Sequence, residues 1–472
     1  MFMRFASPNE RRTISREDLG YYNALVIGAV YNIKTDAEIT FNSFIEPLKQ
    51  CITKHPFLSV TVKDKHTEKP YYERVPELDL SKHISIENAS HESENENKIL
   101  ERFLLPILDR PWPAELPPWR IIALPLPAKE PHEKRCFIAF SYSHALGDGM
   151  SGLIFHKSFL AAWNTVDAYT STSFIVPPCQ ENLPSEFDTP QRLPISWKFL
   201  LSPLIAAYLP KPILGFLGMH ASASPSDAGT WTASRMFFDA SDPKSNSSRV
   251  KILEIEALLV QDVLKACRAH GTKLTGVMHQ IVIRALSTAL PDDGAITNLV
   301  SGTAVNMCSS IGVPESEWGL YVSGHYAIHP HTETESSLLS EEMWESARRM
   351  TTSLAESSSK LHDQPIGLLR YAPSIRGWTE SQIGGRRDCS YRISNLLAFD
   401  PGESGLSRIT KVVFSTPADV TGAPLNLDIV SLKGGSLVCS VGWQAGALGL
   451  DDEEGFVERV LEGTRAGFEG VV

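Results

Sequence analysis

One glycine-rich turn in the first half of the chain separates a strand-like pattern from a helix-like pattern. Over residues 136–143, bulky aromatic and β-branched residues alternate with small or polar ones, which predicts a buried β-strand. Residues 147–149 (Gly-Asp-Gly) interrupt this pattern, because glycine adopts backbone angles that other residues avoid. Residues 150–163 contain no proline and are apolar on nearly every side, which predicts a buried helix. His144 therefore lies where a buried strand ends and a tight loop begins.

Similar patterns predict alternating strands and helices in the rest of the chain. In the first half we expect strands at 24–31, 57–62 and 120–124, and helices at 39–54 and 98–105. In the second half we expect strands at 251–255 and 299–305, and helices at 259–270, 279–290 and 341–360. Thr275 is predicted to cap the 279–290 helix, and Pro291 to end it. Alternation on both sides of a Gly-Gly turn predicts a hairpin of 425–432 and 436–443.

The composition changes this picture only in part. A length of 472 residues favours two domains, and residues 221–248, rich in Ser, Ala and Asp, are expected to link them. Hydrophobic and charged contents of 42% and 21% are ordinary for a soluble globular enzyme. A net charge of -11 argues against a nucleic-acid partner. The same charge means that an anionic co-substrate would need a local cluster of positive residues.

Cysteine usage and hydropathy indicate the compartment. The seven cysteines are scattered without paired spacing, which predicts free thiols in a reducing environment. Neither a secretory signal nor a run of about 18 apolar residues is visible, so we expect a cytoplasmic protein without stable membrane insertion. Residues 195–219 are apolar and aromatic but contain three prolines. They form either a lid or tunnel wall between the halves or a peripheral membrane contact, and their few polar and basic residues favour the first.

The chemistry available to His144 follows from its side chain and its neighbours. A neutral imidazole is the usual general base near neutral pH, because its unperturbed pKa is about 6.5. The chain lacks the G-x-S-x-G motif of serine nucleophiles, and it lacks the H-E-x-x-H and C-x-x-C motifs of metal sites. From the residues alone, His144 is either a general base or a hydrogen-bonded structural histidine. Asp148 either orients the loop, for example through an arginine, or serves a turn.

The hexapeptide from His144 to Gly149, His-Ala-Leu-Gly-Asp-Gly, matches H-x-x-x-D-G, the signature of the CoA-dependent acyltransferase superfamily. Within that superfamily the chain resembles the fungal alcohol O-acetyltransferases. Further segments that resemble the family or the superfamily occur in the same order along nearly the whole chain: Arg11-Arg12-Thr13, Leu19 to Asn23, His55 to Leu58, Pro118 to Arg120, Ser394 to Leu396, Phe414-Ser415 and Gly422-Ala423. Ser143 stands where condensation domains carry a second histidine, and the D-F-G-W-G motif of plant acyltransferases is absent.

The resemblance implies a fold, a reaction and roles for three residues. It implies two chloramphenicol acetyltransferase-like α/β subdomains with mixed sheets, at 1–220 and 221–472, and an active-site tunnel at their interface. It implies direct transfer of an acetyl group from acetyl-CoA to a small-molecule alcohol, with His144 as the general base. Asp148 would hold the loop and not touch the substrate, and Gly149 would let the backbone pass close to the substrate. Cys308 falls where related chains are expected to carry an arginine, so an Asp148–arginine ion pair is in doubt.

Five further residues are weaker candidates, each with a structural alternative. Asn395 or Ser415 could donate a hydrogen bond to the tetrahedral oxyanion, or make an ordinary bond at a strand end. Trp231 could face the tunnel or be a packed aromatic residue. Arg386 and Arg387, beside Gly384-Gly385, could bind the CoA phosphates or lie in a solvent-facing loop.

The expected partners are acetyl-CoA and a small-molecule alcohol. Acetyl-CoA acts as a co-substrate and not as a permanently bound cofactor. We expect the protein to be a monomer. No metal is expected. Two alternatives stay open: a longer acyl-CoA or carrier-protein donor, and a binding or rearrangement protein of natural-product metabolism on the same fold.

Overall fold

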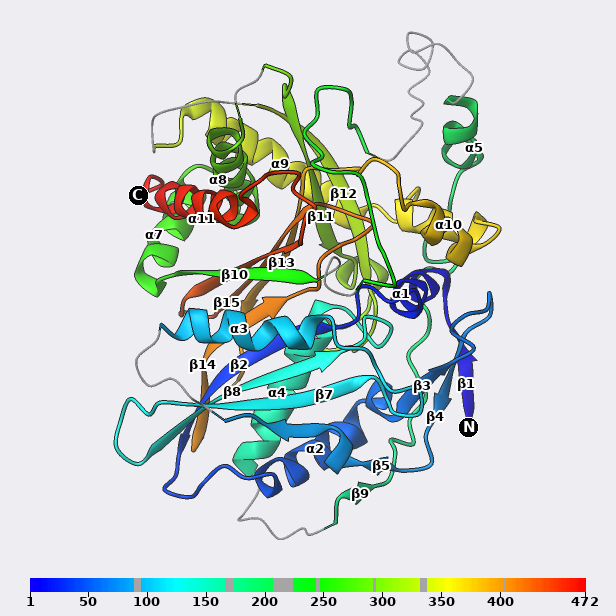
Figure 1. Cartoon of the computed structure of the whole chain (residues 1–472), viewed down its shortest axis with the longest axis vertical. Coiled ribbons are helices and arrows are strands. Elements are labelled where there is room, and N and C mark those ends of the chain that lie inside the picture. The colour runs from blue at the N-terminus through cyan, green and yellow to red at the C-terminus, as the bar shows by residue number, and fades with distance from the viewer. Residues whose placement is uncertain are drawn as a thin grey trace.

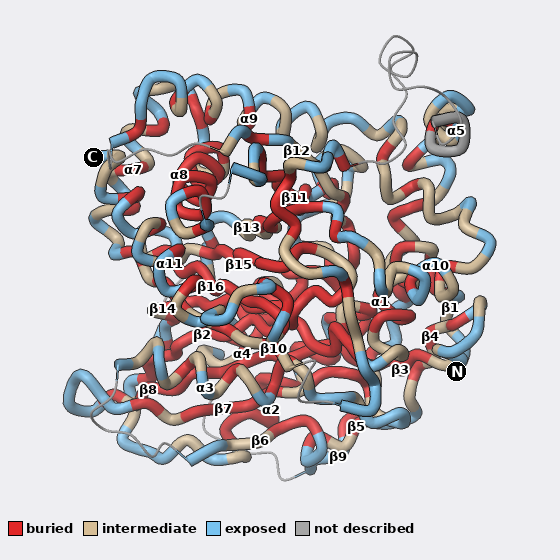
Figure 2. Tube along the Cα trace, turned by 45° about the horizontal axis from the view of Figure 1, so that its top comes forward, coloured by how far each residue is buried: buried red, intermediate tan, exposed pale blue. Residues whose placement is uncertain are grey.

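The computed structural model describes residues 1–88, 95–165, 173–206, 224–242, 247–291, 294–331, 338–402 and 405–472. Two large mixed β-sheets dominate the molecule, one built mainly from each half of the chain, with helices packed on both (Figure 1). Buried residues run through the strands of both sheets and through the region where the sheets meet (Figure 2). The fold is therefore α/β with two layered halves, as the sequence predicts.

The first sheet has five strands in the order β14-β2-β8-β7-β6. They are β2 (Leu25–Lys34), β6 (Ile84–Ile86), β7 (Trp119–Leu126), β8 (Glu133–Tyr142) and β14 (Ser407–Ser415). Only the β6–β7 pair is parallel. One face of the sheet packs on α2 (Asn42–Lys54) and α4 (Gly149–Thr165), and the other face packs on α3 (Glu96–Leu108).

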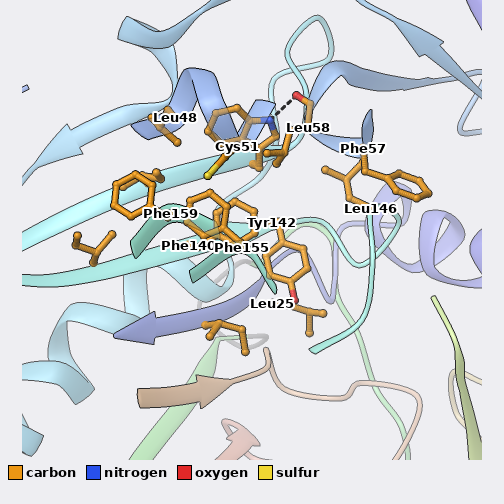
Figure 3. Packing of buried hydrophobic residues seen from close by; sticks show 14 of the residues in the cluster. Leu25, Leu48, Cys51, Phe57, Leu58, Phe140, Tyr142, Leu146, Phe155 and Phe159 are labelled. Atoms are coloured by element: carbon orange, nitrogen blue, oxygen red, sulfur yellow. Dashed lines mark hydrogen bonds between the residues drawn. The ribbon is translucent and has the colours of Figure 1, made fainter. Parts of the chain in front are cut away.

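Aromatic residues fix β8 against α4. Phe140 stacks on Phe155, with ring centroids 3.9 Å apart and an angle of 11° between the planes. Phe159 lies one helical turn further on, 5.5 Å from Phe155, and Tyr142 lies 4.7 Å from Phe140 (Figure 3). These rings are buried, and aromatic side chains bury more apolar area than any others. The loop between β8 and α4, which contains His144, is therefore held firmly at both ends.

The second sheet has six strands in the order β10-β16-β15-β13-β11-β12. They are β10 (Ser248–Ile255), β11 (Asn298–Asn306), β12 (Val322–Pro330), β13 (Tyr391–Phe399), β15 (Leu425–Leu432) and β16 (Leu437–Gln444). β13 pairs in parallel with β11 and β15, and the other pairs are antiparallel. One apolar core joins this sheet to its helices, which are α7 (Ala257–Ala269), α8 (Leu274–Ala289), α9 (Glu341–Ser359) and α11 (Glu453–Glu469).

The two halves are joined by more than the connecting chain. β14 belongs to the second half of the chain, but it pairs along its length with β2 and is an edge strand of the first sheet. Val413 on β14 shares one buried cluster with Val26 of β2 and with Val250 and Val438 of the second sheet. Because this cluster contains strands of both sheets and α3, the halves share apolar core. The domain boundary at residue 220 stays a prediction. β14 follows that boundary in the sequence but belongs to the sheet of the first half.

Smaller elements complete the structure. β1 (Phe2–Phe5), β4 (Tyr71–Arg74) and β3 (Val60–Lys63) form one sheet, and β5 (Leu78–Asp79) pairs with β9 (Ile175–Val176). The remaining helices are α1 (Pro8–Asp18), α5 (Trp197–Ala206), α10 (Ile375–Ser381) and the 3-10 helices η1 (Pro56–Ser59), η2 (Leu80–Lys82), η3 (Ser309–Ile311) and η4 (Pro365–Tyr371). All seven cysteines are free and buried. Within the described ranges, no helix has the length and apolarity needed to cross a membrane.

Most predicted elements are confirmed, and the differences have local causes. The strand predicted at 57–62 begins only at Val60, because Pro56 starts the 3-10 helix η1. The prediction that Thr275 caps a helix is wrong: α8 begins at Leu274, and its N-cap residue Lys273 makes no side-chain cap bond. In the apolar segment 195–219, residues 197–206 form α5 at the periphery of the molecule (Figure 1), and 207–219 lie outside the described residues. Parts of the 221–248 linker, namely 221–223 and 243–246, also lie outside them.

Because β14 and the Val413 cluster join the halves, we expect both halves to unfold in one transition. Val413→Asp would place an unpaired carboxylate at a position that is 1% exposed and should destabilise the protein by roughly 3 kcal/mol or more. Thermal unfolding followed by circular dichroism and tryptophan fluorescence checks this. Lys129→Ala, at an exposed position between β7 and β8 of the same sheet, is the control and should change little. Two well-separated transitions in the wild type would contradict the shared core.

Candidate active site

His144 lies in the loop between the end of β8 and the start of α4, and it is partly buried. Its Nδ1 atom is 3.0 Å from the carbonyl oxygen of Gly147. A carbonyl only accepts hydrogen bonds, so Nδ1 carries the proton in the neutral ring and Nε2 has a free lone pair. Nε2 has no hydrogen-bond partner within the described part of the chain. This is the tautomer that a general base requires.

The backbone of the loop is fixed by tyrosine hydroxyls and a serine. Tyr142 donates to the carbonyl oxygen of Asp148 at 2.6 Å, and Tyr72 donates to that of Ala145 at 2.6 Å. The hydroxyl of Ser143 donates to the Glu17 carboxylate and accepts from the amide of Ala145 at 3.2 Å. The loop carbonyls are thus paired inside the protein, which leaves the imidazole of His144 as the group available for chemistry.

Within the described ranges, Asp148 is held by backbone amides and makes no ion pair with an arginine. Its Oδ1 accepts from the amide of Met150 at 3.0 Å, in the first turn of α4. Its Oδ2 accepts from the amide of Tyr321 at 3.0 Å, in the second half of the chain. Burial raises the pKa of Asp148 to about 6, although these amides act in the opposite direction. Asp148 therefore both caps α4 and ties the loop to the other half.

The segment from Trp318 to Tyr321, just before β12, packs directly on the loop. Trp318 Nε1 donates to the carbonyl oxygen of Leu146 at 2.7 Å. The amide of Asp148 donates to the carbonyl oxygen of Gly319 at 3.0 Å, and the hydroxyl of Ser151 donates to the same oxygen at 3.1 Å. Trp318 is 3% exposed and belongs to the core of the first half. A segment of the second half therefore helps to shape the histidine loop.

Two glycines allow this close packing. A Cβ atom on Gly147 would lie 2.9 Å from Trp318 Nε1 and 2.4 Å from the hydroxyl oxygen of Ser151. A Cβ atom on Gly149 would lie 2.6 Å from Leu396 of β13 and 3.3 Å from Phe414 of β14. Any larger residue at either position would push a neighbouring segment away. These contacts are with the protein's own side chains, so the close approach of the Gly149 backbone to the substrate stays a prediction.

Tyr22, which precedes β2, contacts His144 from the other side. Its ring centroid lies 5.9 Å from that of His144, with 27° between the planes. Its backbone is left-handed, with φ of 60°, a conformation that a non-glycine residue keeps only where contacts fix it. Arg392 Nη2 donates to the Tyr22 hydroxyl at 3.1 Å, and the guanidinium of Arg16 lies 5.5 Å from the Tyr22 ring centroid. Tyr22 thus lies between the histidine and two arginines.

The electrostatic environment keeps His144 uncharged. Burial lowers its pKa to about 3, and the charges of Arg12 and Arg16 contribute to this shift. Both arginines lie on α1, which packs on α10 from the second half. A neutral imidazole is therefore the resting form at every physiological pH.

One face of the second sheet places buried polar side chains at the junction. On β13 and β15, the residues that alternate with the apolar core include Arg392, Asn426 and Asp428, and Ser440 lies opposite Asp428 on β16. The last three residues are at most 1% exposed, and each has a side-chain oxygen without a hydrogen-bond partner among the described residues. Buried polar atoms of this kind usually meet ordered water or a ligand. The junction therefore suits a polar ligand.

The two candidates for oxyanion donor have different surroundings. Asn395 uses both of its side-chain polar atoms: Nδ2 donates to Thr275 at 3.1 Å, and Oδ1 accepts from the amide of Leu397 at 2.8 Å. The hydroxyl of Ser415 is buried at the end of β14 and has no partner among the described residues. Ser415 has a whole hydroxyl without a partner among the described residues, whereas the amide nitrogen of Asn395 keeps only its second N–H.

The other three candidates are engaged in packing or in backbone contacts. Trp231 is 8% exposed and packs on Phe456 in the core of the second half, so it lines that core and not the junction. Arg387 is 1% exposed, and its Nη1 donates to three backbone carbonyl oxygens between residues 419 and 422. Arg386 Nη2 donates to the carbonyl oxygen of Thr230 at 2.8 Å. These bonds give both arginines a structural role in the described geometry, and the binding of CoA phosphates by them stays a prediction.

Sequence reasoning missed several residues around His144. Tyr22 and Arg12 were noted only as parts of a resemblance, and Trp318 and Arg16 were not noted at all. A signal for α1 was available: Ser7 and Glu10 form a capping box, with Pro8 at the first helical position. That helix would have placed Arg12 and Arg16 on one face, four residues apart. No local pattern indicates that Trp318 reaches the loop, because this contact depends on how the halves meet.

Comparison with known families gives one family over most of the chain. A model described as "Alcohol acetyltransferase" matches residues 10–458. A protein of Aspergillus fumigatus, "Probable alcohol acetyltransferase crmB", is 23% identical over 436 residues, which cover 89% of this chain and 88% of that protein. A protein of Fusarium pseudograminearum, "Probable alcohol acetyltransferase FCK4", is 22% identical and covers 86% of this chain and 82% of its own length.

Comparison with solved structures gives the same fold. The TRI3 trichothecene 15-O-acetyltransferase from Fusarium sporotrichioides superposes with a TM-score of 0.65 at 13% identity, covering 98% of this chain and 95% of that one. The first condensation domain of the CDA synthetase superposes with a TM-score of 0.60 at 11% identity, covering 100% and 97%. The two-subdomain fold of acetyltransferases and condensation domains is therefore the fold of this chain.

Asp148→Asn should destabilise the protein and also slow any reaction at His144. A carboxamide has one acceptor oxygen, so either the amide of Tyr321 or that of Met150 would face an NH₂ group instead. We expect a loss of about 1–3 kcal/mol, read as a lower Tm. Asp451→Asn, at an exposed position, is the matched control. A lower rate with an unchanged Tm would contradict the role of Asp148 as a tie between the halves.

The low pKa of His144 can be tested directly by NMR of the imidazole nitrogens, with His144→Gln used to assign the signal. The ring should stay neutral and protonated on Nδ1 between pH 8 and pH 5, because its pKa in the folded protein is about 3. In the unfolded chain the ring takes up a proton near pH 6.5. Its contribution to stability is therefore lost as the pH falls from about 6.5 towards 3. A titration of this signal centred near pH 6.5 would show that the site is not desolvated.

Proposed function

Because this chain belongs to the alcohol acetyltransferase family, whose model matches residues 10–458, we propose that it transfers an acetyl group from acetyl-CoA to the hydroxyl of a small-molecule alcohol, with His144 as the general base. The chain is an acyltransferase by its family. The observation that supports the base is the free Nε2 of a neutral ring whose Nδ1 lies 3.0 Å from the Gly147 carbonyl oxygen. The named activity of TRI3, acetylation of a trichothecene hydroxyl, supports a secondary-metabolite alcohol as the acceptor.

The proposed reaction needs no acyl-enzyme. The hydroxyl oxygen of the alcohol bonds to the thioester carbonyl carbon while its proton passes to Nε2 of His144. The carbonyl electrons move onto oxygen and form a tetrahedral oxyanion. When the carbon–sulfur bond breaks, CoA leaves as a thiolate and takes the proton back from the imidazolium. The products are the acetate ester and free CoA, and His144 is neutral again.

The rate advantage divides between proton transfer and positioning. A positioned general base contributes roughly 10²–10⁴-fold, and orientation of the two substrates contributes the rest. The contacts of Asp148, Tyr22 and Trp318 keep the imidazole in one place before the substrates arrive. Ser415, whose hydroxyl has no partner among the described residues, is our proposed donor to the oxyanion, because the amide of Asn395 is already held in place by Thr275 and Leu397.

We propose that the two substrates meet at the junction of the halves, where His144 lies. The buried oxygen atoms of Asn426, Asp428 and Ser440 that lack partners support a polar channel there. A tunnel open at both sides would admit acetyl-CoA and the alcohol separately. The free, buried cysteines support a reducing compartment, and we propose that the protein acts in the cytoplasm as a monomer.

His144→Ala is the direct test of the proposal. The variant should lose transfer by roughly 10²–10⁴-fold while it keeps its Tm and its affinity for CoA. Mass spectrometry of a panel of small alcohols incubated with acetyl-CoA reads the product as a gain of about 42 mass units. His66→Ala, at an exposed position, is the matched control and should retain full activity. Undiminished turnover in a folded His144→Ala protein would remove the base assignment.

A further inference from the structure

The arginines of α1 differ sharply in their partners. Arg11 is partly exposed, with 23% of its side chain accessible, and pairs with Glu68 at 2.5 Å. Arg12, the next residue, is partly buried, and its Nε and Nη2 share one amide oxygen, that of Asn9, at 3.3 and 3.1 Å. No carboxylate within the described ranges lies within ion-pair distance of Arg12. A guanidinium carries five N–H donors, so most donors of Arg12 remain available.

The charges around Arg12 do not balance. Arg16 and Arg392 lie close by, and both depend on the same carboxylate, Asp419, at 3.7 and 2.7 Å. Burial would raise the pKa of Asp419, but Arg16 and Arg392 hold it below its ordinary value. Asp428 is a second carboxylate beside Arg392, and Arg387 is a fourth guanidinium group beside Asp419, so four positive groups face two carboxylates. Burial and the neighbouring Arg16 lower the pKa of Arg12 to about 10.

An excess of positive charge beside His144 conflicts with the chemistry proposed for it. When the imidazole takes a proton it becomes a cation next to Arg12 and Arg16, and like charges in a desolvated site repel strongly. The conflict disappears if a negative charge arrives together with the substrates. A fixed cation without a partner, placed where negative charge will develop, is the usual means of stabilising such a charge in a protein.

We propose that Arg12, supported by Arg16 and Arg392, forms an anion-binding site beside His144 that receives a negatively charged oxygen atom of the reacting substrates. This inference rests on the proposed function and adds the recognition of charge to it. Arg12 makes the contact with the anionic oxygen. Arg16 and Arg392 are positioning residues: they pack on the ring of Tyr22, which is stacked on His144.

Two sources can supply that oxygen. One is the thioester carbonyl oxygen, which becomes negative as the alcohol oxygen bonds to the carbonyl carbon and its proton moves to Nε2. The other is a carboxylate carried by the acceptor, which would make the acceptor a hydroxy acid. Both require a charge-assisted hydrogen bond from a guanidinium.

The experiment compares Arg12→Gln and Arg12→Lys with Arg11→Gln. The Arg11 variant makes the same substitution on the same helix, but at the surface, and it serves as the matched control. Acetyl transfer is measured with phenylethanol and with phenyllactate, which carries an additional carboxylate next to its hydroxyl. Calorimetric titration with phenyllactate and with phenylethanol, without acetyl-CoA, reads anion binding in the absence of turnover. The Tm of each variant identifies misfolding.

We expect Arg12→Gln to keep its Tm and to lose at least roughly 10-fold in one of these measurements. Arg12→Lys should recover part of this loss, and Arg11→Gln should show no loss. If the oxygen is the oxyanion, kcat falls for both alcohols with little change in KM. If it is an acceptor carboxylate, kcat/KM and calorimetric affinity fall for phenyllactate alone.

A folded Arg12→Gln protein that matches Arg11→Gln in transfer and in calorimetric affinity overturns the anion site. If the wild-type protein acetylates neither alcohol, this result counts against the proposed function and not against the anion site. The calorimetric titration alone then tests the anion site. In that case, equal affinity of wild type and Arg12→Gln for phenyllactate overturns it, and weaker binding by Arg12→Gln supports it. If Arg12→Gln fails to fold, Arg12→Lys carries the same comparison, because it keeps the charge but cannot form the planar contacts of a guanidinium.

Discussion

The carboxylate of Asp148 is shared between the two halves of the molecule, and the geometry around His144 depends on that sharing. One oxygen accepts from the first turn of α4, and the other accepts from the amide of Tyr321 in the second half. A short turn between a strand and a helix has few internal contacts of its own, so its shape is set by whatever packs on it. Here Trp318 packs on it, and the glycines at 147 and 149 leave room for this contact and for Leu396. His144, the proposed general base, is thus placed by the interface between the halves.

The same interface explains why the site is both buried and polar. The apolar sides of the two sheets are covered by helices, while the junction contains arginines, Asp419 and polar residues of β13, β15 and β16. Burying such groups costs free energy unless they are paired, and several of their oxygen atoms have no partner in the part of the chain that the structure describes. A region of buried, incompletely paired polar groups therefore adds less to the free energy of unfolding than an apolar region of the same buried area. Its composition is understandable if the region binds polar, charged substrates.

How much the sequence could predict depended on the range of the contacts involved. The β8–loop–α4 unit, the hairpin of β15 and β16 and most helices follow from local periodicity, and they were predicted correctly. The H-x-x-x-D-G resemblance indicated the family. The partner of Asp148 could not be predicted, because a backbone amide 173 positions away leaves no mark in the side-chain pattern. Trp231 and Arg387 show the opposite difficulty, since composition alone could not distinguish a buried structural residue from one that lines the junction. The capping box of α1 was visible and would have brought Arg12 and Arg16 into consideration.

The central claim is that the reaction takes place at Nε2 of His144, between the two halves. A crystal structure of the protein with CoA bound tests it most directly. The account predicts that the thiol sulfur of CoA lies at the junction, within reach of Nε2, with the imidazole still donating from Nδ1 to the Gly147 carbonyl oxygen. CoA bound elsewhere, for example in the surface cavity beneath α3 lined by Arg102 and Arg110, or a His144 ring closed off from the bound thiol, would contradict it.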